Sequence, residues 1–161
     1  MKKILALILS LAGCGAVLPE GKPEVYEYSH NTCAMYPYYY YKVDVGEDGQ
    51  QRLSFSNYTD TITVVRLNED VLGKIGEIVS GCRMHKIKES YTPSMLVLDG
   101  YTWHLSIKFP NTKIYSSGQN ARPKGSIREG IEKINEMLKS ISAAAAEEDI
   151  IGYASHNDRR P

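Results

Sequence analysis

The sequence lacks the patterns that mark the common enzyme and nucleic-acid-binding classes. Its 161 residues include three cysteines and four histidines, with no C-x-x-C pair and no two histidines at a metal-ligand spacing, so no metal site is expected. It has neither a G-x-S-x-G turn nor a phosphate-binding loop. Its 19 basic and 19 acidic residues balance, which argues against a nucleic-acid partner. We therefore expect no cofactor and no enzymatic activity, although catalytic groups that meet only in the fold leave no sequence pattern.

Long apolar runs are scarce as well, and the one that exists stands at the start of the chain. Ile4–Leu11 follows Lys2 and Lys3 and leads into Leu-Ala-Gly-Cys, ending at Cys14. The run is under about 12 residues, too short for a transmembrane helix of about 20. This segment resembles a bacterial lipoprotein signal with its lipobox. The resemblance implies that residues 1–13 are removed and that Cys14 carries the lipid; ordinary signal cleavage after Ala16 is the alternative.

A lipidated Cys14 predicts where the protein is located. A diacylglyceryl group supplies two acyl chains, which anchor a protein stably to a membrane. Because Gly15 and not Asp follows the cysteine, we expect the outer membrane of the cell envelope, facing the periplasm or the cell surface. Removing the first 13 of 161 residues leaves 148, enough for one domain. Residues 14–23 are interpreted as its tether.

The remaining cysteines are Cys33 and Cys82, an even number in an oxidising compartment. We predict a disulfide between them, which would stabilise the fold by about 4 kcal/mol on the chain-entropy account. Two buried thiols that behave as small apolar residues are the alternative.

Alternation of apolar and polar residues predicts several strands. They are expected at residues 24–28, 36–45, 52–58, 61–67, 95–98, 101–109 and 113–117. Turn residues at Gly46–Gly49 and at Asp99-Gly100 predict hairpins. In the strand over 101–109 every second residue is apolar, and Trp103 is expected to anchor the core.

Helical periodicity predicts two helices. The first covers 68–81 with Asn68 as its N-cap, and the second begins at Ser126, whose spacing to Glu129 is that of a capping box. We expect the second helix to extend toward Ile151, with residues 153–161 as a loose polar tail. The sequence thus predicts one α+β domain over 24–152, with a mainly antiparallel sheet of about five to seven strands and two helices on one face.

Two motifs give the chain a family resemblance. Asp99-Gly100-x-x-Trp103 and Gly118-x-Asn120-Ala121-x-Pro123 precede the last helix. In this the chain resembles a group of small, uncharacterised bacterial lipoproteins. The resemblance covers roughly residues 60–141 and implies an α+β fold but no activity. The chain departs from the pattern after Pro123, where no aromatic residue follows.

The turn from Gly118 to Pro123 allows two interpretations. Gly and Asn accept the left-handed backbone that tight turns need, which makes the turn structural. Alternatively it is a ligand-facing loop above a helix N-terminus, where Arg122 and Lys124 would favour an anion.

The run of tyrosines from Tyr36 to Tyr41 is the best indication of function. In a strand Tyr36, Tyr38 and Tyr40 face one way and Tyr39 and Tyr41 the other. One face packs in the core, and the other either covers neighbouring strands or forms an exposed surface suited to a glycan or an envelope protein. We expect a non-catalytic binding or accessory protein that uses Tyr36, Tyr38, Tyr40 and Arg122. The alternative is an exported inhibitor or immunity-type protein that blocks an envelope hydrolase.

Overall fold

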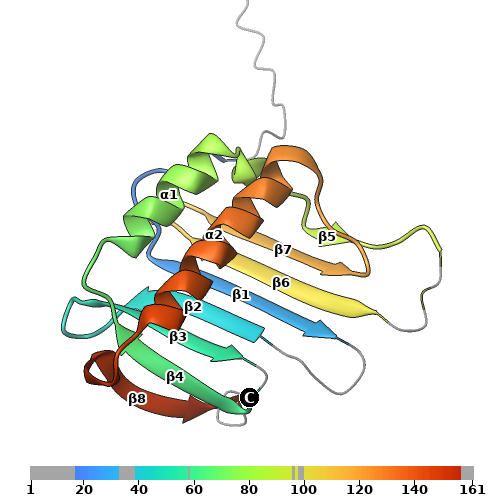
Figure 1. The fold of residues 1–161 in the computed structure, drawn as a ribbon. Coiled ribbons are helices and arrows are strands. Elements are labelled where there is room, and N and C mark those ends of the chain that lie inside the picture. Colours follow the sequence, from blue (N-terminus) through green and yellow to red (C-terminus); the bar gives the residue numbers. More distant parts are fainter. Residues whose placement is uncertain (1–16, 33–38, 58, 96, 98–99, 157–161) are drawn as a thin grey trace, which may run out of the picture.

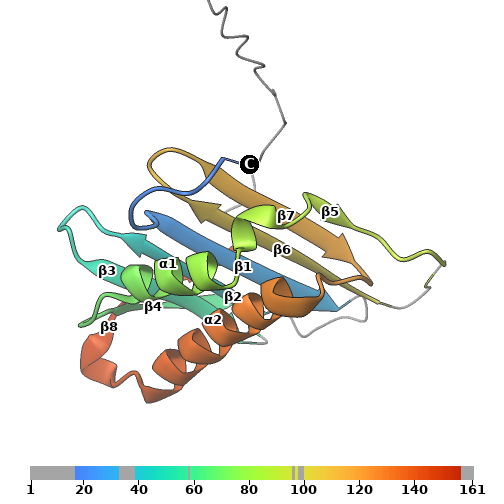
Figure 2. The same ribbon diagram turned by 90° about the horizontal axis from the view of Figure 1, so that it is seen from above.

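The computed structural model describes residues 17–32, 39–57, 59–95, 97 and 100–156. The fold is α+β: one sheet of eight strands carries two helices on one face (Figures 1 and 2). The strands follow the spatial order β5-β7-β6-β1-β2-β3-β4-β8, and every neighbouring pair is antiparallel except β5 and β7. The strands are β1 Val25–Thr32, β2 Tyr39–Val45, β3 Gln51–Asn57, β4 Thr61–Arg66, β5 Ser90–Tyr91, β6 Tyr101–Lys108, β7 Lys113–Gln119 and β8 Ile150–Ser155. The helices are α1 Val71–Gly81 and α2 Gly125–Ala144, with 3₁₀ turns at Met84–Lys86 and Glu147–Asp149.

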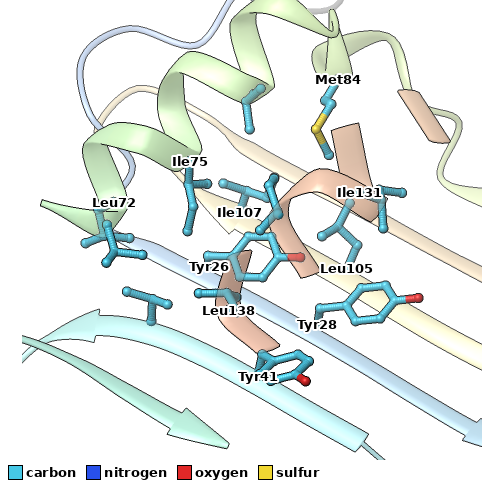
Figure 3. Packing of buried hydrophobic residues seen from close by; sticks show 14 of the residues in the cluster. Tyr26, Tyr28, Tyr41, Leu72, Ile75, Met84, Leu105, Ile107, Ile131 and Leu138 are labelled. Carbon is cyan, nitrogen blue, oxygen red and sulfur yellow. The ribbon is translucent and has the colours of Figure 1, made fainter. Parts of the chain in front are cut away.

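One hydrophobic core fills the space between the sheet and the helices. Every second side chain of β1 and β6 points into it, as Tyr26, Trp103 and Leu105 show by their near-zero exposure. Each helix adds the apolar stripe of an amphipathic helix, including Ile75 from α1 and Leu138 from α2. Figure 3 shows Ile75, Leu105 and Leu138 around Tyr26. The predicted core role of Trp103 is confirmed.

The predicted fold class is right, but the strand count is wrong. The sheet has eight strands and not five to seven. The short β5 pairs with β7 over two residues, too few to produce an alternating pattern. The other addition, β8, occupies residues where we expected a helix and a loose tail: α2 ends at Ala144, and the chain turns through Glu147–Asp149 to pair with β4. Pairing with the open edge of β4 overrides the helix propensity of the alanine run.

A strand predicted over 95–98 is not found at Met95 and Val97; its other two residues lie outside the described part of the chain. We expected it to form a hairpin with β6, but both edges of β6 are occupied, by β1 and by β7. Met95 and Val97 lie in an exposed loop instead. The hairpin predicted at Gly46–Gly49 does join β2 to β3, where the N–H of Gly46 donates to the carbonyl oxygen of Gln50 at 2.8 Å.

The helix caps differ from the predicted ones. Asp70, and not Asn68, is the N-cap of α1, and its Oδ1 accepts a hydrogen bond from the N–H of Gly73 at 3.0 Å. The same carboxylate accepts from Gln51 Nε2 at 2.7 Å, which ties α1 to β3. In α2 the cap position is Lys124, without a side-chain hydrogen bond, so Ser126 does not form the expected capping box.

The structure bears in part on the tether and on the cysteines. Residues 17–23 do not hang loose from the domain: the N–H of Glu20 donates to Oδ1 of Asn111 at 3.0 Å, and Nδ2 of Asn111 donates to the carbonyl oxygen of Leu18 at 3.0 Å.

Cys82 is a buried free thiol after α1, so the predicted disulfide is not formed. Its proposed partner Cys33 and the lipidation residue Cys14 lie outside the described residues.

Candidate functional site

The helices leave one part of the sheet uncovered, beside α2. The helix crosses the sheet diagonally, with α1 on one side of it and the ends of β1 and β2 on the other (Figures 1 and 2). Two cavities of about 410 and 570 Å³ lie along α2 and share Tyr39, Asn135 and Glu136, so they form one groove. We call it the tyrosine groove. Aromatic side chains from four strands line it: Tyr28, Tyr39, Tyr41, Phe55 and Trp103.

An aromatic stack lies next to this groove and shares Tyr39 with it. His30 on β1 lies between Tyr39 on β2 and Tyr101 on β6, because those strands flank β1 on either side. The ring centroids of His30 and Tyr39 are 4.8 Å apart, those of His30 and Tyr101 are 5.3 Å apart, and the planes are nearly parallel. The guanidinium of Arg122 lies over the ring of Tyr101, with its Cζ 4.6 Å from the ring centroid. Such cation–π contacts hold a guanidinium in a fixed orientation.

A hydrogen bond joins Arg122 to His30. Nη2 of Arg122 lies 3.0 Å from Nε2 of His30, and because a guanidinium can only donate, the imidazole nitrogen accepts. The proton of the neutral ring is therefore on Nδ1, which is buried and has no hydrogen-bond partner among the residues that the structure describes. Burial, and then the charge of Arg122, hold the pKa of His30 below its ordinary value. A neutral His30 thus orients Arg122 and is not itself a charged ligand group.

The floor of the groove carries tyrosine hydroxyls. The hydroxyl of Tyr26 donates to Oδ1 of Asn135 at 3.0 Å, which links the core to the groove-lining side of α2. Burial, together with the neighbouring Tyr39, raises the pKa of Tyr28, so its hydroxyl stays protonated. Figure 3 shows Tyr28 and Tyr41 at the margin of the core cluster. The floor therefore offers neutral hydroxyl groups beside apolar rings.

Charged side chains of both signs stand along the rim. Arg128 is neutralised by Glu132, with Nε 2.7 Å from Oε1, whereas Glu136 lines both cavities. Arg122 differs from Arg128: within the described part of the chain no carboxylate lies within 4.0 Å of its guanidinium. One of its five N–H donors serves His30, so others remain for an external acceptor.

The two sequence motifs build the support under Arg122. Nε1 of Trp103 donates to the carbonyl oxygen of Ala121 at 2.7 Å, and Oδ1 of Asn120 accepts from the N–H of Tyr101 at 2.7 Å. Asn120 has a φ of 52°, the left-handed conformation that asparagine tolerates. Gly118 lies so close under the indole that an added Cβ would be 2.2 Å from Nε1. The structural interpretation of this turn therefore holds, and the turn also places Arg122 at the groove.

Only part of the predicted binding surface lies at this site. Arg122 does, whereas Tyr36 and Tyr38 lie outside the described residues. Tyr40 points to the other face of the sheet, is 2% exposed and packs with the ring of His156, so it is not an accessible contact.

We missed groove residues in the sequence because we placed the binding surface on the wrong face of the sheet. We expected Tyr38 and Tyr40 to contact a ligand, whereas Tyr39, which points to the opposite face, lines the groove. Tyr39 was assigned to the face opposite the expected binding surface, and part of that face is open because α2 crosses the sheet diagonally. One sequence pattern could have indicated this face. Every second residue from 26 to 30 is an aromatic with a polar atom, namely Tyr26, Tyr28 and His30, and in a strand these share one face.

On the other face of the sheet, polar side chains pair with one another through ion pairs and hydrogen bonds. Asp44 accepts from Lys42 and Arg52, each at 2.6 Å. Burial alone would raise the pKa of Asp44, but these two hydrogen bonds outweigh it and hold the pKa below its ordinary value. Oγ of Ser56 lies 2.8 Å from Nε2 of His156, but Ser56 is only 3% exposed. A hydroxyl so buried does not present a nucleophile to a substrate.

Comparison with known proteins assigns no family. No protein-family model matches the chain, and a search of the curated proteins gives no match. Among the described residues, no group of three or more His, Cys, Asp or Glu side chains could hold a metal ion. No helix in the same part of the chain has the length and apolar character to cross a bilayer.

Proposed function

We propose that this protein is a lipid-anchored, non-catalytic binding protein of the bacterial cell envelope and that its ligand lies in the tyrosine groove. The observation that carries the proposal is Arg122, fixed by the ring of Tyr101 and by His30 at the end of an aromatic groove. Binding sites are typically concave and largely apolar, with a few oriented polar groups. The groove is concave and presents aromatic rings, but it is more polar than such a site: charged and amide side chains, among them Arg122, Asn135 and Glu136, line it beside the rings.

The anchor and the groove stand at different ends of the sheet in this proposal. The first described residues bond to Asn111 in the turn after β6, whereas Tyr101 begins that strand at the Arg122 end of the groove. Seven steps of β6 separate the two ends by about 23 Å. A chain tethered through Cys14 would therefore hold the Arg122 end away from its point of attachment.

A groove-filling variant tests the proposal. In Ser142→Trp an indole would occupy the groove, because Ser142 lines it. Ser140→Trp is the matched control, since Ser140 lies two residues away on the exposed side of α2. The mature protein is immobilised and offered isolated peptidoglycan, surface polysaccharide and detergent-extracted envelope proteins in separate experiments.

The expected result is that one fraction retains the wild type and Ser140→Trp but not Ser142→Trp. Equal retention of both variants, or no retention of any fraction by the wild type, would contradict a groove-binding function. Retention of a hydrolase that loses activity in the complex, by both variants alike, would instead favour the inhibitor alternative.

A further inference from the structure

We propose that the ligand of the tyrosine groove is an extended glycan that carries widely spaced carboxylates, one of which pairs with Arg122. The inference rests on the proposed function and adds the chemical class of the ligand. It follows from the length of the groove, from the kinds of groups that line it and from the charge of its rim.

The groove is long, because two adjoining cavities along α2 make it up. Its lining on α2 begins at Arg128 and reaches Ala143, 15 helical steps or about 22 Å. The two cavities adjoin, since both are lined by Tyr39, Asn135 and Glu136. A compact metabolite would fill one end only, whereas a chain of linked rings would fill the whole length.

The lining alternates ring surfaces with hydrogen-bonding side chains. Tyr39 and Phe55 are partly exposed and offer flat apolar surface, and the C–H faces of a sugar ring pack on such surfaces. Asn57, Asn135 and Glu136 lie between and beside them. Amides and carboxylates of this kind pair with sugar hydroxyls, which both donate and accept.

A peptide fits this groove less well. Extended peptides bind by adding a strand to an open sheet edge, where their main-chain groups find partners. The groove lies over a face of the sheet, and the strands beneath it, β1, β2 and β3, are each paired on both sides. A peptide backbone laid there would lose water without gaining main-chain hydrogen bonds.

The charged side chains of the groove indicate that the glycan is acidic and has a low charge density. Arg122 is exposed, oriented by Tyr101 and His30, and has N–H donors directed to no carboxylate of the described chain. A guanidinium in a fixed orientation pairs with a carboxylate through two parallel hydrogen bonds. The groove is also lined by Glu136 and Lys139, and its Arg128 is paired with Glu132. The lining therefore has only a small excess of positive charge, which offers few partners to a densely charged polyanion. One carboxylate every few rings satisfies both conditions.

Two tetrasaccharides with the same backbone test the inference. One alternates N-acetylglucosamine with N-acetylmuramic acid and so carries lactyl carboxylates; the other, chitotetraose, lacks them. Calorimetry on the mature protein should give an affinity about tenfold or more higher for the acidic chain, the value of a hydrogen-bonded charge pair. Arg122→Gln should reduce it to the level of chitotetraose, whereas Lys124→Gln, which removes a nearby exposed charge, should leave it unchanged.

The other outcomes contradict the inference. Equal affinity for the two chains, or equal effects of Arg122→Gln and Lys124→Gln, would overturn the role of Arg122. If neither chain binds, the glycan assignment fails; the proposed function survives that result only if Ser142→Trp still abolishes retention of another envelope fraction. Thermal unfolding of each variant verifies that the fold is intact.

Discussion

Nε1 of Trp103 donates a hydrogen bond of 2.7 Å to the carbonyl oxygen of Ala121, 18 residues along the chain. The next residue is Arg122, which lies over the ring of Tyr101 two residues before the tryptophan. The bond therefore connects the buried centre of β6 to the turn that carries the exposed guanidinium. In this chain it makes the strand around Trp103 and the turn around Ala121 packing partners of one another.

Gly118→Ala should destabilise the protein, because its Cβ would lie 2.2 Å from Nε1 of Trp103 and 2.6 Å from the carbonyl oxygen of Ala121. We expect the free energy of unfolding, measured with urea, to fall by about 1–3 kcal/mol. Gly152→Ala is the control, since nothing lies within 4 Å of its Cβ, and it should change stability by less than about 0.5 kcal/mol. Similar losses in both variants would show that the Trp103 packing is not the cause.

Asn120 contributes both a hydrogen bond and a left-handed backbone, and two variants separate these. Asn120→Gly loses the bond to the N–H of Tyr101 but keeps the conformation, whereas Asn120→Ala loses the bond and strains the backbone. We expect Asn120→Ala to be less stable than Asn120→Gly by about 1 kcal/mol in denaturant unfolding. The reverse order would contradict the turn geometry.

His30 should make the stability depend on pH. Its pKa in the folded protein is lowered by burial and then by Arg122, so as the pH falls the unfolded chain takes up the proton first. The free energy of unfolding is therefore expected to fall from about pH 7 to pH 5, starting near the ordinary histidine pKa of about 6.5. In His30→Gln this part of the pH dependence should be absent.

His104→Gln is the matched control for that measurement. His104 is an exposed histidine on the other face of the sheet, and its replacement should preserve the wild-type slope of stability against pH. If His30→Gln keeps the same slope as His104→Gln, the buried neutral state of His30 is not the source of the pH dependence.

Cys14→Ser tests the anchor. If Cys14 is the lipidation residue, the variant should incorporate no radiolabelled palmitate and should appear in the soluble fraction of the cells, while the wild type is labelled and sediments with membranes. Continued labelling of Cys14→Ser would contradict the assignment. Cys33→Ser, which leaves the lipobox intact, should be labelled like the wild type.

The alternating strands and the helical stripes could be predicted from sequence because each has its own period and one buried face. The strand β8 could not, since Ala143 to Ala146 favours helix locally and only the open edge of β4 draws the following residues into the sheet. The position of the N-cap at Asp70 likewise depends on a residue distant in sequence, since the Asp70 carboxylate accepts a hydrogen bond from Gln51. Long-range pairing decided each of these features.

The candidate site was predictable only in part. Arg122 was identified from its turn, but its contact with His30 joins residues 92 apart in the chain. The tyrosine run predicted an aromatic surface. Which of the alternating tyrosines remains accessible, however, depends on where α2 crosses the sheet. Tyr40 is covered on the other face, and Tyr39 lines the groove.

The location of the ligand is the central claim, and chemical-shift mapping tests it most directly. ¹⁵N-labelled mature protein is titrated with the envelope fraction or acidic tetrasaccharide that it retains. We predict the largest changes at the side-chain amide of Asn135, at Nε of Arg122 and at the backbone of Tyr39, with none at Lys42 or Arg52 on the other face of the sheet. Changes centred on Lys42 and Arg52, with Asn135 and Arg122 unmoved, would contradict the account.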